Sequence, residues 1–205
     1  MTTTERATDE SHEGFPDDGN VLLLAPSVGN AERDACTGML AHHDATDGRA
    51  IHVLYMESAI ERHRLIESRL PHHPVASAVV AVGAGGVVGK RGPEPPAEDY
   101  HVERLTDPAD LTGLGMALND ALGEWAVAGD VTLCFDSLSI LLQYADTERV
   151  FRFLHVLTNR LTELGASTHF HLDPAAHDER TIAQLAQAFD SRVSVDNEDD
   201  RVVRR

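Results

Sequence analysis

The sequence predicts an α/β protein in three layers (α/β/α), with helices on both faces of a mostly parallel sheet of about six strands. Short apolar runs alternate with amphipathic helical patterns along the chain. These runs are apolar nearly throughout, as in strands that are covered on both faces. The length of 205 residues, with 42% hydrophobic residues, suits one domain of this kind.

Six segments have the composition of buried strands, being apolar and rich in β-branched residues. In chain order they are 21–25, 50–56, 75–82, 131–135, 167–172 and 192–195. Strands that are joined by helices run parallel, so their carboxyl ends share one edge of the sheet. Ligands of open α/β sheets bind at that edge.

Amphipathic helical patterns fill the intervals between these strands. The clearest covers 147–164, where apolar residues recur every three or four positions. Asp146 or Thr147 can cap its start, and Gly165 ends it. The other helical patterns cover 31–43, 59–69, 111–126 and 178–189.

The two ends of the chain differ in composition from the rest. Residues 1–19 and 197–205 are highly charged and have little to bury, so we expect an acidic tail and a charged tail around one domain, 20–196. Within that domain, 83–99 holds five glycines and three prolines. It predicts a long surface loop or a lid, and the sequence leaves its role open.

The charge of the chain is strongly acidic, with 34 acidic residues against 17 basic ones, of which only Lys90 is a lysine. Such an acidic surface is typical of proteins from halophiles, whose cytoplasm contains molar salt that screens the repulsion between carboxylates. An ordinary acidic protein of unusual composition is the alternative. The negative field makes nucleic acid an unexpected partner. The sequence shows neither a basic leader nor a membrane-length apolar run, so we expect a cytoplasmic protein without a membrane partner.

The segment after the first expected strand, "APSVGNAERD" from position 25, has the outline of a phosphate-binding loop. Such a loop needs glycines, a lysine that reaches the outer phosphates, and a hydroxyl that holds Mg²⁺. Ala31 occupies the position of the lysine and Glu32 that of the hydroxyl. The chemistry of the loop is therefore missing, although its outline remains.

The acidic residues at the start of the following helix make the charge of this site negative, where a phosphate-binding loop is positive. Glu32 and Asp34 fall in the first helical turn, where their carboxylates occupy the positive end of the helix dipole and repel a triphosphate. We interpret Ser27, Gly29 and Asn30 as a degenerate nucleotide-binding turn, in which Asn30 can also cap the helix.

A second glycine-rich stretch, 84–91, contains Lys90 directly after the strand 75–82. Prolines follow at once and prevent an ordinary helix from starting there, so the stretch lacks a helix dipole for phosphate. In an assembly, Lys90 and Arg91 could instead supply charge to a nucleotide on a neighbouring subunit.

Two acidic residues follow expected strands, Asp136 in "VTLCFDSLSIL" and Glu57 in "VLYMES". In these stretches, and in strand and helix order over about 20–196, the chain resembles the RecA/KaiC superfamily of ATPases. It is most similar to small KaiC-like proteins of halophilic archaea, which often lack an intact nucleotide loop. The resemblance implies a P-loop NTPase core, with Asp136 matching the aspartate that supports Mg²⁺ and Glu57 the base that activates water. Alternatively, Asp136 bonds to Ser137 or a backbone amide, and Glu57 caps the next helix.

The histidines suggest a rival chemistry. His169 and His171 are two apart on one strand face, and Asp173 follows just beyond. These three could hold Zn²⁺ with one open position, as in a metal-dependent hydrolase. The alternative is that the two histidines are buried and satisfy each other or a neighbouring helix. Cys36 and Cys134 lie far apart in sequence, and we expect buried, reduced thiols.

The main functional hypothesis is a non-catalytic RecA/KaiC-like domain that acts as a regulatory or signalling interaction module in a halophile. It would bind a protein partner or further copies of itself and would need no cofactor. One alternative is a nucleotide-binding protein or slow ATPase that takes ATP with Mg²⁺ on an atypical loop. The other is the histidine-ligated hydrolase.

Overall fold

The computed structural model describes residues 19–42, 48–55, 57–70, 76–83, 100–125, 130–195 and 203–204. Its strands belong to one sheet, and in chain order they are β1 (Asn20–Leu24), β2 (Arg49–Leu54), β3 (Ala76–Val82), β4 (Tyr100–Leu105), β5 (Val131–Asp136), β6 (Ser167–Leu172), β7 (Ser191–Ser194) and β8 (Val203–Arg204). Their order across the sheet is β4-β3-β2-β5-β6-β1-β7-β8. Strands β1 to β7 run parallel, and β8 pairs antiparallel with β7.

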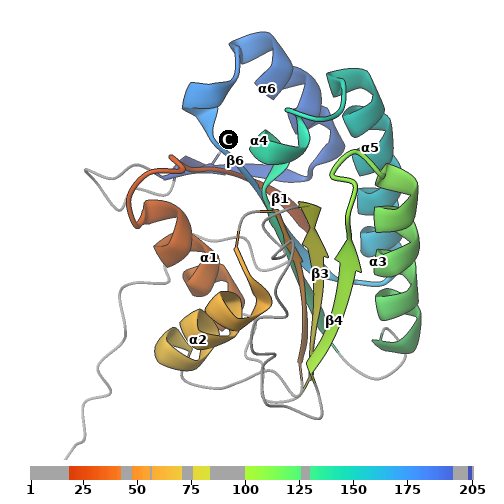
Figure 1. Ribbon diagram of the computed structural model, residues 1–205. Coiled ribbons are helices and arrows are strands. Elements are labelled where there is room, and N and C mark those ends of the chain that lie inside the picture. The colour runs from red at the N-terminus through yellow and green to blue at the C-terminus, as the bar shows by residue number, and fades with distance from the viewer. Residues whose placement is uncertain are drawn as a thin grey trace, which may run out of the picture.

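Helices cover both faces of this sheet, which confirms the predicted three-layer α/β/α fold. The helices are α1 (Ala31–His42), α2 (Ala59–Arg69), α3 (Leu111–Trp125), α4 (Leu138–Leu141), α5 (Thr147–Glu163) and α6 (Glu179–Leu185), with short 3-10 turns η3 (Pro174–Ala176) and η4 (Ala186–Ala188). Figure 1 shows α1 and α2 together on one face and α3, α5 and α6 on the other.

Alternate residues of each strand pack against different layers, as the pleat of a strand requires. In β1, Leu22 and Leu24 belong to the main core under α3 and α5, whereas Val21 and Leu23 pack against α1. The main core includes Phe135 of β5 and Phe170 of β6, which are fully buried. The α1/α2 face of the same two strands carries cysteine and histidine instead.

Truncation of Phe170 is expected to lower the free energy of unfolding by ~3–5 kcal/mol, as for other buried phenylalanines. The Phe170 ring stacks on Phe135 with centroids 5.4 Å apart and contacts Phe189 at 5.1 Å, so Phe170→Ala leaves a cavity between both partners. Chemical denaturation at constant high salt measures the change. Val156→Ala on the exposed side of α5 is the control, with an expected change within ~0.5 kcal/mol. Equal losses in the two variants would contradict this packing.

The sequence missed two strands, and both lie at the ends of the sheet. Among the described strands, β4 has one neighbour, β3, and its sequence "YHVERL" mixes polar with apolar residues. It therefore lacks the continuous apolar run by which the six expected strands were recognised, all of which are present. The second, β8, lies inside the expected tail 197–205, where Val203 and Arg204 pair with β7. Three expected segments lie outside the described residues: the tail 1–18, the loop 84–99 with Lys90 and Arg91, and all of the tail 197–205 but residues 203–204.

The expected ends of α5 are confirmed. The Asp146 side chain accepts a hydrogen bond from the backbone N–H of Arg149 and caps the first turn. At the other end, Gly165 has a φ of 66°, in the left-handed region that a helix C-terminus often uses. The expected helix 178–189 is shorter, because α6 ends at Leu185 and η4 follows it.

Candidate functional site

A cleft of about 960 Å³ lies at the carboxyl edge of the sheet, between α1 and α2. It is lined by residues from the turns after β1 and β2, from α1, α2 and α4, and from the ends of β5 and β6. These are Ser27, Gly29, Glu32, Arg33, Cys36, Glu57, Glu61, Arg62, Arg64, Leu65, Ser68, Asp136, Ser137, Ile140 and His171. The parallel strands thus bring the degenerate loop and both carboxylates to one place, where α/β proteins bind ligands.

In the turn after β1, backbone groups that could bind a ligand already have hydrogen-bond partners within the chain. Gly29 has a φ of 109°, which favours glycine, and the exposed backbone N–H of Ser27 donates to the Asp173 carboxylate at 3.0 Å. The Asn30 carbonyl accepts from the Asp34 N–H as α1 begins. A backbone amide that could face a phosphate therefore already holds a carboxylate.

Both acidic residues in the first turn of α1 have partners within the chain. The Glu32 carboxylate lies 2.7 Å from Nδ1 of His171, and Asp34 pairs with Arg69 at the end of α2. These contacts tie α1 to β6 and to α2, so the two acids have structural roles at the place where a phosphate loop would carry positive charge.

The two carboxylates that the resemblance assigns to catalysis are joined by one arginine. Arg62 of α2 donates from Nε to Glu57 at 2.6 Å and from Nη2 to Asp136 at 2.7 Å. Its Nη1 lies 3.2 Å from Sγ of Cys36 and 3.6 Å from Sγ of Cys134. The guanidinium thus occupies the space between the carboxylates with its own positive charge.

Burial decides the protonation behaviour of these groups. Burial raises the pKa of Glu57 and of Asp136, and the guanidinium of Arg62 opposes the rise. Burial also disfavours the charge on Arg62, but the surrounding thiols and carboxylates hold the pKa of Arg62 well above its usual value. Arg62 is 2% exposed and is a permanent buried cation with two acidic partners.

Arg62 reaches this position because α2 is firmly anchored. Ser58 caps the helix, and Glu61 returns a bond to the Ser58 N–H, which completes a capping box. Arg62 and Ile66, one helical turn apart, are both buried against the sheet. The sequence analysis missed Arg62, although its position four residues before Ile66 on the apolar side was a signal.

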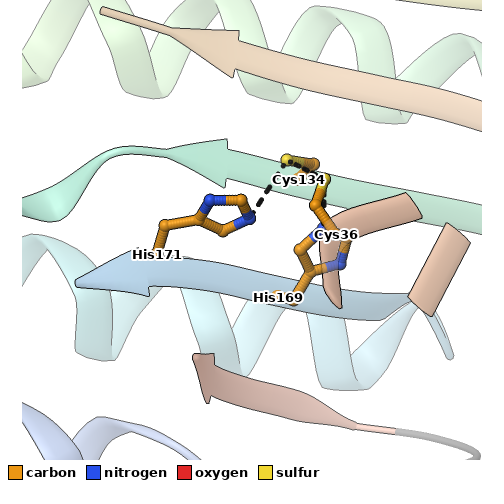
Figure 2. A group of neighbouring side chains, drawn as sticks. All are labelled: Cys36, Cys134, His169 and His171. Atoms are coloured by element: carbon orange, nitrogen blue, oxygen red, sulfur yellow. Dashed lines mark hydrogen bonds between the residues drawn. The ribbon is translucent and has the colours of Figure 1, made fainter. Parts of the chain in front are cut away.

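A second cluster lies beneath the cleft, on the α1/α2 face of the sheet. Figure 2 shows Cys36 from α1, Cys134 from β5, and His169 and His171 from β6, all pointing toward one another. The four are fully buried or nearly so. The two sulfur atoms are 3.4 Å apart, His169 Nε2 is 3.3 Å from Sγ of Cys36, and His171 Nε2 is 3.6 Å from Sγ of Cys134.

The pKa values of the four side chains in this cluster shift in different directions. The hydrogen bond from Cys134 lowers the pKa of Cys36, whereas burial raises the pKa of Cys134. Burial lowers the pKa of His169. Burial acts in the same direction on His171, but its hydrogen bonds with Cys36 and Glu32 raise the pKa of His171 to about 10.

His52 of β2 extends the row of polar residues across the sheet. In the strand register it lies beside Cys134, which in turn lies beside His169. His52 is fully buried, and the described residues offer no hydrogen-bond partner to either of its ring nitrogens. Burial lowers the pKa of His52 to about 3, so its imidazole is neutral.

The structure separates the expected trio of His169, His171 and Asp173. The two imidazole rings stack at 5.3 Å and point to the cysteines, whereas the Asp173 carboxylate accepts from the N–H groups of Ser27 and Ala175 and caps η3. Burial opposes this charge, but the bonds from Ser27 and Ala175 together outweigh burial and lower the pKa of Asp173. Sequence reasoning found the histidines but not the cysteines beside them, because nothing in the local pattern links the two cysteines.

Comparison with known proteins identifies a family. A model described as a family of unknown function, DUF7504, matches residues 19–195. The chain belongs to this family. No protein with a curated description matches the DUF7504 chain. Among solved structures, one from Pyrococcus horikoshii OT3, titled only as a structural study, is similar with a TM-score of 0.58 and 7% sequence identity, covering 92% of this chain and 85% of that one.

That similarity extends to the fold alone, so the chemistry of the DUF7504 chain has to be argued from its own residues. Among the residues described, every helix is too short or too polar to cross a membrane.

Proposed function

We propose that this protein is a non-catalytic RecA/KaiC-like domain that acts as a regulatory or signalling interaction module in the cytoplasm of a halophile. The observation that carries the proposal is Arg62, whose guanidinium binds both Glu57 and Asp136. A Mg²⁺ ion needs oxygen ligands that are free to coordinate it, and a base that activates water has to reach the water. Both carboxylates are instead turned toward an arginine.

The turn after β1 supports the same proposal. Ser27 donates its amide to Asp173 inside the chain, and Ala31 and Glu32 supply neither the lysine nor the hydroxyl of a working loop. With catalysis lost, the role that remains is binding, either to a protein partner or to further copies of this chain. Exposed apolar side chains on the α3/α5 layer, Met116 and Val156, are available for such contacts.

One observation favours the second candidate function, nucleotide binding on an atypical loop. The cleft is large, and Arg33 and Arg64 line it together with Arg62. Arginine binds phosphate through several N–H groups, so these side chains could replace a loop lysine. In this second candidate Arg62 would have to release Asp136 before Mg²⁺ could bind there.

Titration calorimetry with Mg²⁺·ATP in about 2 M KCl separates the two candidates, since high salt keeps an acidic fold intact. For the interaction module we expect no saturable heat up to millimolar ATP in protein that circular dichroism shows to be folded. An intact RecA/KaiC-like ATPase from a halophile, titrated in the same buffer, is the positive control.

Saturable binding that Asp136→Asn abolishes would overturn the proposal in favour of a nucleotide-binding protein. Arg33→Gln is the companion variant, because Arg33 lines the cleft from an exposed position and its loss leaves the buried pairs untouched. If the wild-type protein binds and Arg33→Gln weakens binding, the arginines of the cleft hold the phosphates.

A further inference from the structure

We propose that Cys36, Cys134, His169 and His171 bind one Zn²⁺ ion in a closed tetrahedral site beneath the cleft (Figure 2). This site is separate from the interaction role proposed above. It also differs from the hydrolase hypothesis, because the cysteines replace Asp173 and leave no open coordination position. A closed site of four protein ligands is structural rather than catalytic.

The spacing of the ligand atoms fits this ion. Zn–S bonds of ~2.3 Å and Zn–N bonds of ~2.0–2.1 Å at tetrahedral angles place neighbouring ligand atoms ~3.3–3.8 Å apart. The sulfur pair is 3.4 Å apart, and each sulfur lies near one imidazole nitrogen, at 3.3 and 3.6 Å. All four ligand atoms lie within 4.8 Å of one another. Small side-chain movements would complete the tetrahedron.

The composition of the ligand set favours zinc. Two thiolates and two neutral imidazoles are a common structural zinc set, and their charges cancel that of the ion. The chain has only two cysteines in 205 residues, 98 positions apart, and the fold brings both to this point. A buried layer that served packing alone would carry apolar side chains here, as the opposite face of β5 and β6 does with Phe135 and Phe170.

Outer contacts orient the ligands as metal sites require. His171 Nδ1 donates to the carboxylate of Glu32 at 2.7 Å, so Nδ1 keeps its proton and Nε2, the atom near Cys134, is the nitrogen from which Zn²⁺ would displace a proton. A carboxylate bound to the far nitrogen of a histidine ligand is a frequent second partner in zinc sites. Arg62 adds N–H contacts to both sulfur atoms, which stabilise thiolates.

A second group of donor atoms, Glu32, Asp136 and His171, also lies close together. It is the weaker candidate because its carboxylates are committed, that of Asp136 to Arg62 and that of Glu32 to His171. The two groups share His171, and the first uses Nε2 while Glu32 holds Nδ1. The buried set therefore keeps the bond between His171 and Glu32 when a metal replaces the contacts among the four ligand atoms.

The test uses the full chain without a histidine tag, purified at high salt and equilibrated with Zn²⁺. We expect one zinc per chain by elemental analysis after gel filtration. X-ray absorption at the zinc edge is expected to show two sulfur neighbours at ~2.3 Å and two nitrogen neighbours at ~2.0 Å. Zinc on surface carboxylates would instead show oxygen neighbours alone. That result, or protein that retains no zinc, would overturn the proposal, as would an intact mass that shows a Cys36–Cys134 disulfide in freshly purified protein.

Variants separate the ligands from their surroundings. Cys134→Ser is expected to abolish stoichiometric zinc, and Glu32→Gln to weaken zinc affinity ~10–100-fold through His171. His155→Gln, a change at an exposed histidine of α5, is the matched control and is expected to keep full zinc content. The absorption spectrum of the wild type decides the question even if Cys134→Ser fails to fold. Full zinc affinity in a folded Cys134→Ser protein would overturn the assignment.

Discussion

Replacing Arg62 with alanine is expected to lower the free energy of unfolding by ~3–5 kcal/mol. Arg62 is 2% exposed and binds two carboxylates that are themselves largely buried. Its removal leaves Glu57 and Asp136 as neighbouring negative charges without a partner, and it opens space beside the two cysteines. Urea denaturation in high KCl, followed by circular dichroism, measures the loss.

Two comparisons show whether the loss comes from the buried charges. Arg64→Ala, at an exposed position two residues along the same helix, is expected to change stability by less than ~0.5 kcal/mol. Adding Glu57→Gln and Asp136→Asn to an Arg62→Met protein removes the unpaired charges and should restore most of the stability. Arg62→Ala protein as stable as the Arg64→Ala control would mean that the guanidinium does not stabilise the two carboxylates.

Removing the metal is expected to have the second large effect. A ligand that binds only the folded state stabilises it by about 4 kcal/mol when its free concentration is ~1,000 times its dissociation constant. The proposed zinc ligands come from α1, β5 and β6, so loss of the ion removes one of the links between α1 and the sheet. Denaturation of zinc-loaded protein, compared with protein stripped by a chelator, measures this difference.

The specificity of that effect is tested with a variant that lacks one ligand. Cys36→Ser protein is expected to unfold at the same denaturant concentration with and without zinc, whereas His155→Gln protein should respond as the wild type does. If stripping leaves the wild-type curve unchanged, the four side chains contribute no metal-dependent stability.

Periodicity was sufficient to predict the central strands and five of the helices, whereas the four-residue helix α4 was missed. The runs that became β1, β2 and β5 are buried on both faces, so most of their positions are apolar. β4 was missed because His101, Glu103 and Arg104 interrupt its apolar residues, as a strand at the end of the described sheet allows. A strand that is buried on both faces is therefore easier to recognise in a sequence than a strand with exposed residues.

The site was predictable only in part. Glu57, Asp136 and the turn at 26–30 were placed at one edge because parallel strands end together, and the cleft does lie there. Arg62 and the cysteines could not be placed in the same way, because their contacts depend on how α1 and α2 sit on the sheet. The position of Arg62 four residues before Ile66 marks it as a residue on the buried side of α2, but its contacts with the carboxylates and the cysteines appear only in the packed structure.

The contact of Arg62 with its two carboxylates also decides how the cleft responds to dissolved cations. A dissolved cation exchanges with its surroundings, and its occupancy follows its concentration. Arg62 is a cation tethered to the backbone, so dilution and chelators cannot displace it. One positive charge thus stays beside Glu57 and Asp136, whatever the magnesium level of the cell. Only a rearrangement of α2, such as one that a binding partner imposes, could expose those charges.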